Sequence, residues 1–251
     1  MNIDKLYEDD DLIIVNKPAG LLVVPDRFNH ELPSLNKILE ARLGQKIWIV
    51  HRLDRDTSGV ICFAKNEVAH RYLSMLFQER DVNKFYAGLV IGIVNPPEGR
   101  IENALAEHPA ANGKMIVAKK GKIAVTDYKV VEQWPLYSLL QFQIHTGRTH
   151  QIRVHMQSIG HPIVCDELYG DGQPFLLSNI KRKYRMSEKD EQEKPLLNRL
   201  GLHAYRIEFQ KEDGQLVNAE ATLPRDIAAC VKQLNKWTKS REQQSDSENM
   251  V

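Results

Sequence analysis

Two short polar segments hold most of the side chains that could do chemistry. The first is HRLDRDTSG at residues 51–59, which combines a histidine, two arginines and two aspartates. A guanidinium close to a carboxylate favours the ionised form, so Asp54 near Arg52 or Arg55 can stay charged when it is partly buried. An ionised aspartate can act as a nucleophile or as a base. The same residues could instead form a connecting loop held by Asp–Arg pairs and a tight turn, and their spacing leaves both interpretations open.

The second segment is HTGRTHQIRVH at residues 145–155, and it favours an anion-binding turn. Thr149 is expected to cap the helix that follows, where free backbone N–H groups bind phosphate. Arg148 and Arg153 add positive charge. His150 and Arg153 are three residues apart and therefore share a helix face.

Other kinds of site are less well supported. His150 and His155 are five residues apart, whereas two ligands on one helix are usually three or four apart, so no metal is predicted. Asp54 and Asp56 could be an acid pair for glycoside hydrolysis, but a loop does not fix their separation. The motifs GxxxxGK[ST], GxGxxG and GxSxG do not occur, which disfavours nucleotide hydrolysis, dinucleotide redox chemistry and α/β-hydrolase chemistry.

These segments must be carried by rigid elements, and the hydrophobic pattern predicts mostly strands. Strands are predicted at residues 12–15, 21–24, 60–64, 85–94, 123–131, 139–145 and 202–209. Helices are predicted from Ser34 to Leu43, after a cap at Asn66, from Thr149 to Gly160, and from Pro224 to Trp237. Many strands follow each other without a crossover helix, so we expect an α+β fold with a mixed, mainly antiparallel sheet flanked by helices.

Length and composition predict one soluble domain. The 251 residues include 42% hydrophobic and 27% charged side chains, which excludes a collagen, a coiled-coil rod and a wholly disordered chain. We expect a single domain over residues 1–239, a charged insertion at about 172–200, and a disordered tail at 240–251. The longest apolar run is far shorter than the roughly 20 residues of a membrane helix. Three cysteines that lie far apart favour a reducing, cytoplasmic compartment.

The net charge says nothing about binding partners, but the distribution of charge along the chain is informative. The formal charge is only +1. Basic segments at residues 111–129 and 181–185 could form one phosphate-facing surface, or their lysines and arginines could simply solvate exposed loops.

Taken in order along the chain, several blocks resemble the RluA-type pseudouridine synthases. The resemblance covers about residues 10–210 and is carried by IVNKPAG at 14–20, HRLDRDTSG at 51–59, KFYA at 84–87, TGRTHQIRVH at 146–155, GHPI at 160–163, DELYG at 166–170 and LHA at 202–204. Each block alone is a weak signal, but HRLDxxTSG and TGRxHQIRxH in this order are specific. The resemblance implies a pseudouridine synthase fold with a central RNA-binding cleft.

The resemblance also implies roles for particular residues. Asp54 matches the catalytic aspartate, Arg153 the arginine that pairs with it, and Tyr86 the tyrosine that stacks on the target base. The target uridine must leave its stack to be reached, and Arg52 could fill the vacated space with its planar guanidinium. Substrate-binding roles are expected for His51, Arg52, Leu53, Arg55, Thr57, Ser58, Gly59, Arg148, Thr149, His150, Gln151 and Leu202.

The implied activity is the isomerisation of uridine to pseudouridine in ribosomal or transfer RNA. It needs no metal and no cofactor, and it implies RNA as the partner of a monomer that requires no membrane and no second protein. Members of the family often carry an N-terminal S4-type RNA-binding domain, which is not expected here because the catalytic block begins near Met1. Two alternatives are a catalytically silent RNA-binding module on the same scaffold and a hydrolase that uses Asp54 and Asp56. Whether Asp54 attacks the ribose, attacks the base or assists proton removal is left open.

Overall fold

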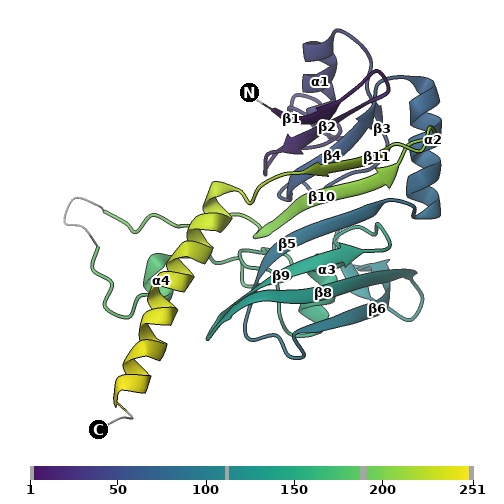
Figure 1. Cartoon of the computed structure of the whole chain (residues 1–251). Coiled ribbons are helices and arrows are strands. Elements are labelled where there is room, and N and C mark those ends of the chain that lie inside the picture. Colours follow the sequence, from purple (N-terminus) through teal and green to yellow (C-terminus); the bar gives the residue numbers. More distant parts are fainter. Residues whose placement is uncertain (1–2, 111–112, 187–190, 249–251) are drawn as a thin grey trace.

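The computed structural model describes residues 3–110, 113–186 and 191–248, and it is built around one large sheet (Figure 1). Its strands are β1 (Asp4–Glu8), β2 (Leu12–Lys17), β3 (Trp48–Ile49), β4 (Ser58–Ala64), β5 (Asn83–Ile91), β6 (Glu98–Glu107), β7 (Met115–Val117), β8 (Lys122–Trp134), β9 (Tyr137–Ile144), β10 (Leu202–Gln210) and β11 (Leu216–Glu220). The helices are α1 (Leu35–Leu43), α2 (Glu67–Glu79), α3 (Gln151–Ser158) and α4 (Arg225–Glu248), with a 3-10 turn, η1, at Leu177–Asn179.

The sheet confirms the expected α+β class. Its order is β1-β2-β4-β10-β5-β9-β8-β6-β7, with β11 paired to β10 and β3 paired to β4. Neighbouring strands pair antiparallel, except that β4 and β10 run parallel. At this parallel pairing Gly59 has a φ of 118° and lies against the backbone of Ala204, where a Cβ atom would collide with the carbonyl oxygen. The glycine is therefore required for β4 and β10 to approach each other.

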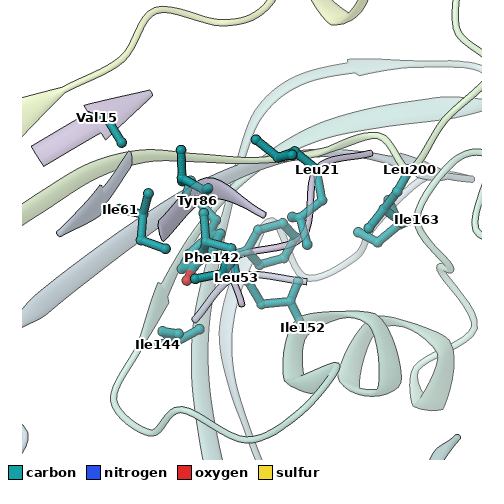
Figure 2. Packing of buried hydrophobic residues seen from close by; sticks show 14 of the residues in the cluster. Val15, Leu21, Leu53, Ile61, Tyr86, Phe142, Ile144, Ile152, Ile163 and Leu200 are labelled. Atoms are coloured by element: carbon teal, nitrogen blue, oxygen red, sulfur yellow. The ribbon is translucent and has the colours of Figure 1, made fainter. Parts of the chain in front are cut away.

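Alternation along β2 and β4 buries both faces of the sheet. On β4, Ile61 and Phe63 face one core cluster together with Leu35 and Leu39 of α1. Val60, Cys62 and Ala64 face the opposite cluster, which contains Ala69, Leu73 and Leu76 of α2. Figure 2 shows that the first cluster also contains Leu53 and Tyr86, so the candidate site lies directly on the core.

Local capping signals predicted two helices correctly. Helix α1 is preceded by Ser34, whose side chain makes no capping hydrogen bond, and is followed by Gly44 in the left-handed conformation. Helix α2 starts after Asn66, whose side chain accepts a hydrogen bond from the Ala69 N–H. These signals depend only on neighbouring residues, so the sequence was sufficient to recognise them.

The predicted strand at residues 21–24 was wrong. Only one isolated bridge forms there, between Leu22 and Ser34. The carbonyl groups of Leu22 and Val23 accept hydrogen bonds from Leu35 and Asn36 at the start of α1. Because these carbonyls serve the first turn of a helix, they are not available to pair with a strand.

The last helix also differs from the prediction. Helix α4 continues past Trp237 to Glu248, so the backbone of residues 240–248 is helical instead of disordered. Its Arg, Glu and Gln residues are good helix formers, which the compositional argument for disorder did not weigh. Residues 249–251 of the expected tail lie outside the described residues.

The charged insertion at about 172–200 is anchored at both ends. Phe175 and Leu197 are buried in one core cluster and form an isolated bridge with each other. Arg199 makes a two-pronged ion pair with Asp226 of α4 at 2.7 Å for both bonds. In the described part of the chain, no helix is long and apolar enough to cross a membrane.

Candidate active site

One cleft of about 840 Å³ brings the two polar segments together. Its walls come from the loop at residues 49–57, the end of α2, the start of β5, the turn at 146–150 and helix α3. Thirteen of the predicted site residues line it, namely His51, Arg52, Leu53, Asp54, Arg55, Thr57, Tyr86, Arg148, Thr149, His150, Gln151, Arg153 and Leu202. Ser58 and Gly59 do not line it, because they belong to buried strand β4.

A buried lysine holds the 51–57 loop in place. Lys17 Nζ donates to the carbonyl oxygens of Pro18, Leu21 and Arg55 at 3.0, 2.8 and 2.8 Å. Gly20 N–H also donates to the Arg55 carbonyl at 2.9 Å, and Arg55 Nε donates back to the Gly20 carbonyl at 3.1 Å. Burial lowers the pKa of Lys17 to about 7, although the carboxylates of Asp56 and Asp54 oppose that shift. The 51–57 loop is thus tied to the turn that follows β2.

Asp54 faces Arg153 of α3 and His150, which directly precedes that helix. Its Oδ2 atom lies 3.5 Å from Arg153 Nη1 and 4.0 Å from His150 Nε2. The Asp54 side chain keeps 27% of its surface exposed, so a ligand in the cleft can reach it. The structure therefore brings together the aspartate and the arginine that the sequence predicted to be partners.

Arg153 is held mainly by a different carboxylate, that of Asp166. Arg153 Nε and Nη2 donate to the two Asp166 oxygens at 2.7 and 2.8 Å, which leaves Nη1 for Asp54. Asp166 is buried and also accepts from the N–H groups of Leu168 and Tyr169, both at 3.0 Å. Such a bidentate pair fixes the plane of the guanidinium. Sequence reasoning assigned no role to Asp166, although a buried arginine on α3 requires a carboxylate partner.

His150 links the cleft to Tyr169. Its Nδ1 atom lies 2.9 Å from the Tyr169 hydroxyl, which accepts a hydrogen bond from the Met115 N–H at 2.7 Å. If the hydroxyl donates to Nδ1, the imidazole proton sits on Nε2 and faces Asp54. Burial lowers the pKa of His150, and the nearby Asp54 charge opposes that shift. His150 is therefore mainly neutral at pH 7.

Tyr86 lies on the floor of the cleft. It is buried on β5, where it pairs with Ala204 of β10 and Phe142 of β9. Burial, followed by the negative charge of Asp54, raises the pKa of the phenol above its ordinary value. Tyr86 thus stays protonated and offers an aromatic surface with an O–H group (Figure 2).

Two predicted substrate-binding residues are engaged in structural contacts. His51 Nε2 accepts from the Cys62 N–H at 3.0 Å, and its ring stacks on Phe77 at 4.5 Å. Burial and the positive charge of Lys84 lower the pKa of His51 to about 3, so its ring is uncharged. The Gln151 amide contacts Thr146, Arg148, Val125 and Thr126 through four hydrogen bonds.

The predicted cap at Thr149 was wrong. Helix α3 begins after His150, which has a left-handed φ of 54° and makes no side-chain cap. The Gln151 side chain accepts from the Arg148 N–H at 3.1 Å and so fixes the turn before the helix. A side chain inside the helix therefore replaces the expected cap.

The structure adds a third wall that sequence reasoning missed. Phe77, Gln78 and Arg80 at the end of α2, with Lys84 on β5, also line the cleft. Lys84 stands in the KFYA block but was assigned no role, and nothing local in the sequence shows that the end of α2 meets β5 at the cleft. Across the described ranges, no cluster of three or more His, Cys, Asp or Glu side chains could hold a metal ion.

The cleft thus brings a carboxylate, an arginine and a tyrosine together among basic side chains on a mixed sheet. Residues 11–158 match the family model described as RNA pseudouridylate synthase, and the chain belongs to that family. A solved structure titled Human RNA Pseudouridylate Synthase Domain Containing 4 is 27% identical and superposes with a TM-score of 0.71, covering 92% of this chain and 93% of that one.

Curated relatives are similar over most of this chain. Ribosomal large subunit pseudouridine synthase D of Neisseria meningitidis serogroup B is 41% identical over 233 residues, which are 90% of this chain and 60% of the relative. An uncharacterized RNA pseudouridine synthase of Aquifex aeolicus is 44% identical over 177 residues, which are 67% of this chain and 56% of the relative. The chain thus spans about 60% of the length of these relatives.

Proposed function

We propose that this protein is an RNA pseudouridine synthase that converts uridine to pseudouridine with Asp54 as its catalytic carboxylate. The observation that carries the proposal is that Asp54, Arg153 and Tyr86 meet in one cleft, with Asp54 Oδ2 3.5 Å from Arg153 Nη1. The names of the relatives favour ribosomal RNA of the large subunit as the substrate. The three free, buried cysteines are consistent with work in a reducing cytoplasm.

The reaction assigns separate tasks to the cleft residues. The target nucleotide flips out of its stack, and its base lies on Tyr86 and Leu202. The C1′–N1 bond breaks, the uracil turns, and C5 bonds to C1′. C5 then loses its proton and N1 gains one, so the atoms balance without a redox partner. Asp54 is the group placed to attack or to accept a proton, and Arg153 lies beside it.

The geometry disfavours a two-carboxylate hydrolase. Asp56 is exposed and does not line the cleft, whereas Asp54 does. A glycosidase requires two carboxyl groups that flank one scissile bond. A silent RNA-binding module would have no use for Asp54 held by an arginine and facing a buried tyrosine.

The test is tritium release from RNA labelled at uridine C5, with ribosomal RNA from cells that lack the gene as substrate. We expect Asp54→Asn to lower turnover on the order of 10³-fold or more, while RNA binding stays within a few-fold because phosphate contacts supply most of the affinity. Asp56→Asn is the matched control and should retain near wild-type turnover. Equal losses in both variants, or release of free base, would favour the hydrolase, and an active Asp54→Asn variant would remove the catalytic assignment.

A further inference from the structure

Lys84 is a buried cation in the cleft that no other part of the described chain neutralises. Its exposed fraction is 8%, and it lines the cleft near the start of β5. Among the described residues, no hydrogen bond or ion pair engages its ammonium group, and its contact is with the Phe77 ring, 5.6 Å from the ring centroid. Lysines are almost never this buried unless they are paired.

The charged surroundings of Lys84 increase its need for an anion. The charged side chain that acts on it most strongly is Arg80, another cation. His51, which stacks on Phe77, is uncharged because its own pKa is lowered to about 3. Burial, with the repulsion from Arg80, lowers the pKa of Lys84 to about 8, so the ammonium form still predominates at pH 7.

Lys84 also has a defined position relative to Tyr86. The two residues alternate on β5 and point to the same face of the sheet, with Lys84 opposite Ile144 and Tyr86 opposite Phe142. The repeat along one strand face is about 7 Å. A base that stacks on Tyr86 would therefore place a phosphate of its own nucleotide, or of the next one, within reach of Lys84.

We propose that Lys84, supported by Arg80, binds a backbone phosphate adjacent to the target uridine and so fixes the register of the RNA in the cleft. The inference rests on the proposed function, because it takes the base position from Tyr86. Arg80 is well placed for the role, since its left-handed backbone ends α2 with an N–H bond to the Leu76 carbonyl and its side chain lines the cleft. The ligand is a phosphodiester, a class of anion that a compact ammonium binds as a point charge.

The experiment compares Lys84→Met with a matched control, Lys129→Met. Lys129 is exposed on β8, pairs with Glu98 at 3.9 Å, and lies on the opposite face of the sheet from the cleft. The probe is the labelled heptaribonucleotide AAAUAAA, and its binding is measured by fluorescence anisotropy at several salt concentrations. Two further probes carry a neutral methylphosphonate on the 5′ or the 3′ side of the uridine.

We expect Lys84→Met to weaken binding of the charged probe about tenfold and to lower the salt slope by roughly 0.7, the value for one contact to a single strand. One of the two methylphosphonate probes should bind wild type about as weakly as the charged probe binds Lys84→Met. For that probe, wild type and Lys84→Met should have the same affinity. Lys129→Met should match wild type. Lys84→Arg should recover part of the affinity because the charge remains.

Two results would overturn the inference. One is a Lys84→Met variant that binds the charged probe as well as wild type does. The other is that Lys84→Met weakens binding by the same factor for the charged probe and for both methylphosphonate probes. That result would mean that Lys84 contacts the base and not a phosphate. Tritium release by wild type on ribosomal RNA tests the proposed function separately. Lys84-dependent phosphate binding without isomerisation would reject the activity and keep the phosphate site.

Discussion

The two sides of the cleft treat buried positive charge differently. On the side formed by the 51–57 loop and α3, protein oxygen atoms contact the buried cations: three carbonyls surround Lys17, which lies behind the loop, and two carboxylates face Arg153. On the side formed by the end of α2 and the start of β5, Lys84 has only an aromatic contact among the described residues. The side whose cations have protein partners is held in place by contacts within the protein. The side with Lys84 lacks such partners, and we expect a ligand to supply them.

Breaking the paired side at Arg153 should have the largest effect. Arg153→Met leaves Asp166 buried without its bidentate partner and removes the cation beside Asp54. Loss of one member of a buried ion pair costs about 3–5 kcal/mol of unfolding free energy. We expect turnover at saturating RNA to fall at least about 100-fold. Urea unfolding and tritium release measure the two effects.

Arg153→Lys is the informative control, because it keeps a charge but loses the planar fork. It should retain part of the turnover. A Met variant with normal saturated turnover and only a raised half-saturation concentration would show that Arg153 contacts phosphate and does not act on Asp54.

Lys17→Met should have the second largest effect, and the effect should be on stability. The substitution leaves the carbonyls of Pro18, Leu21 and Arg55 without their shared donor. We expect a loss of about 2–4 kcal/mol of unfolding free energy at pH 7. Urea unfolding checks the value, and unchanged stability would mean that the loop does not depend on this lysine.

The smallest effect on stability is expected for Lys84→Met at pH 7. Removing a buried cation without a counter-charge costs no hydrogen bond within the described chain, so the unfolding free energy should change by less than about 1 kcal/mol or should rise slightly. The same urea titration gives the answer. If Lys84→Met lowered the unfolding free energy as much as Lys17→Met does, the two sides of the cleft would not differ in the way described.

The pH dependence of stability sharpens the comparison. Both lysines have a folded pKa below the ordinary 10.5, about 7 for Lys17 and about 8 for Lys84. Between those values and 10.5 the unfolded chain holds more protons, so each lysine makes the unfolding free energy rise with pH, by at most about 1.4 kcal/mol per pH unit. Between pH 7 and 9.5, the unfolding free energy of each Met variant should therefore rise less than that of wild type. The reduction should be larger for Lys17→Met.

The sequence predicted best what is decided locally. The caps of α1 and α2 and the apolar strands β2, β4 and β9 follow from neighbouring residues. Strands β6 and β11 were missed because most of their side chains are only partly buried or exposed, so their apolar pattern is weak. The segment at 21–24 was misassigned because its carbonyls bind a helix that comes later in the chain.

The same division holds for the site. Asp54, Tyr86, Arg153 and Asp166 all stand in recognisable motifs, but the hydrogen bonds from Arg153 to Asp166 depend on the turn after α3. Lys84 is notable because no counter-charge lies beside it among the described residues. A sequence pattern cannot show that such a neighbour is missing in space. Ser58 was assigned to substrate because it belongs to a motif, but its hydroxyl bonds His203 Nδ1 at 2.9 Å inside the fold.

On the proposed function, the sheet has a consequence for the choice of uridine. It runs from β4 through β10 and β5 to β9, with one register shift between β10 and β5. Closing the cleft by bending this region would break hydrogen bonds between strands, so we expect the protein to stay rigid and a bound RNA to deform. Extracting a nucleotide costs a few kcal/mol when it is stacked and paired, and least when it is already unpaired. Under the proposed function we therefore expect bulged or looped uridines to react ahead of uridines of similar sequence in regular helices.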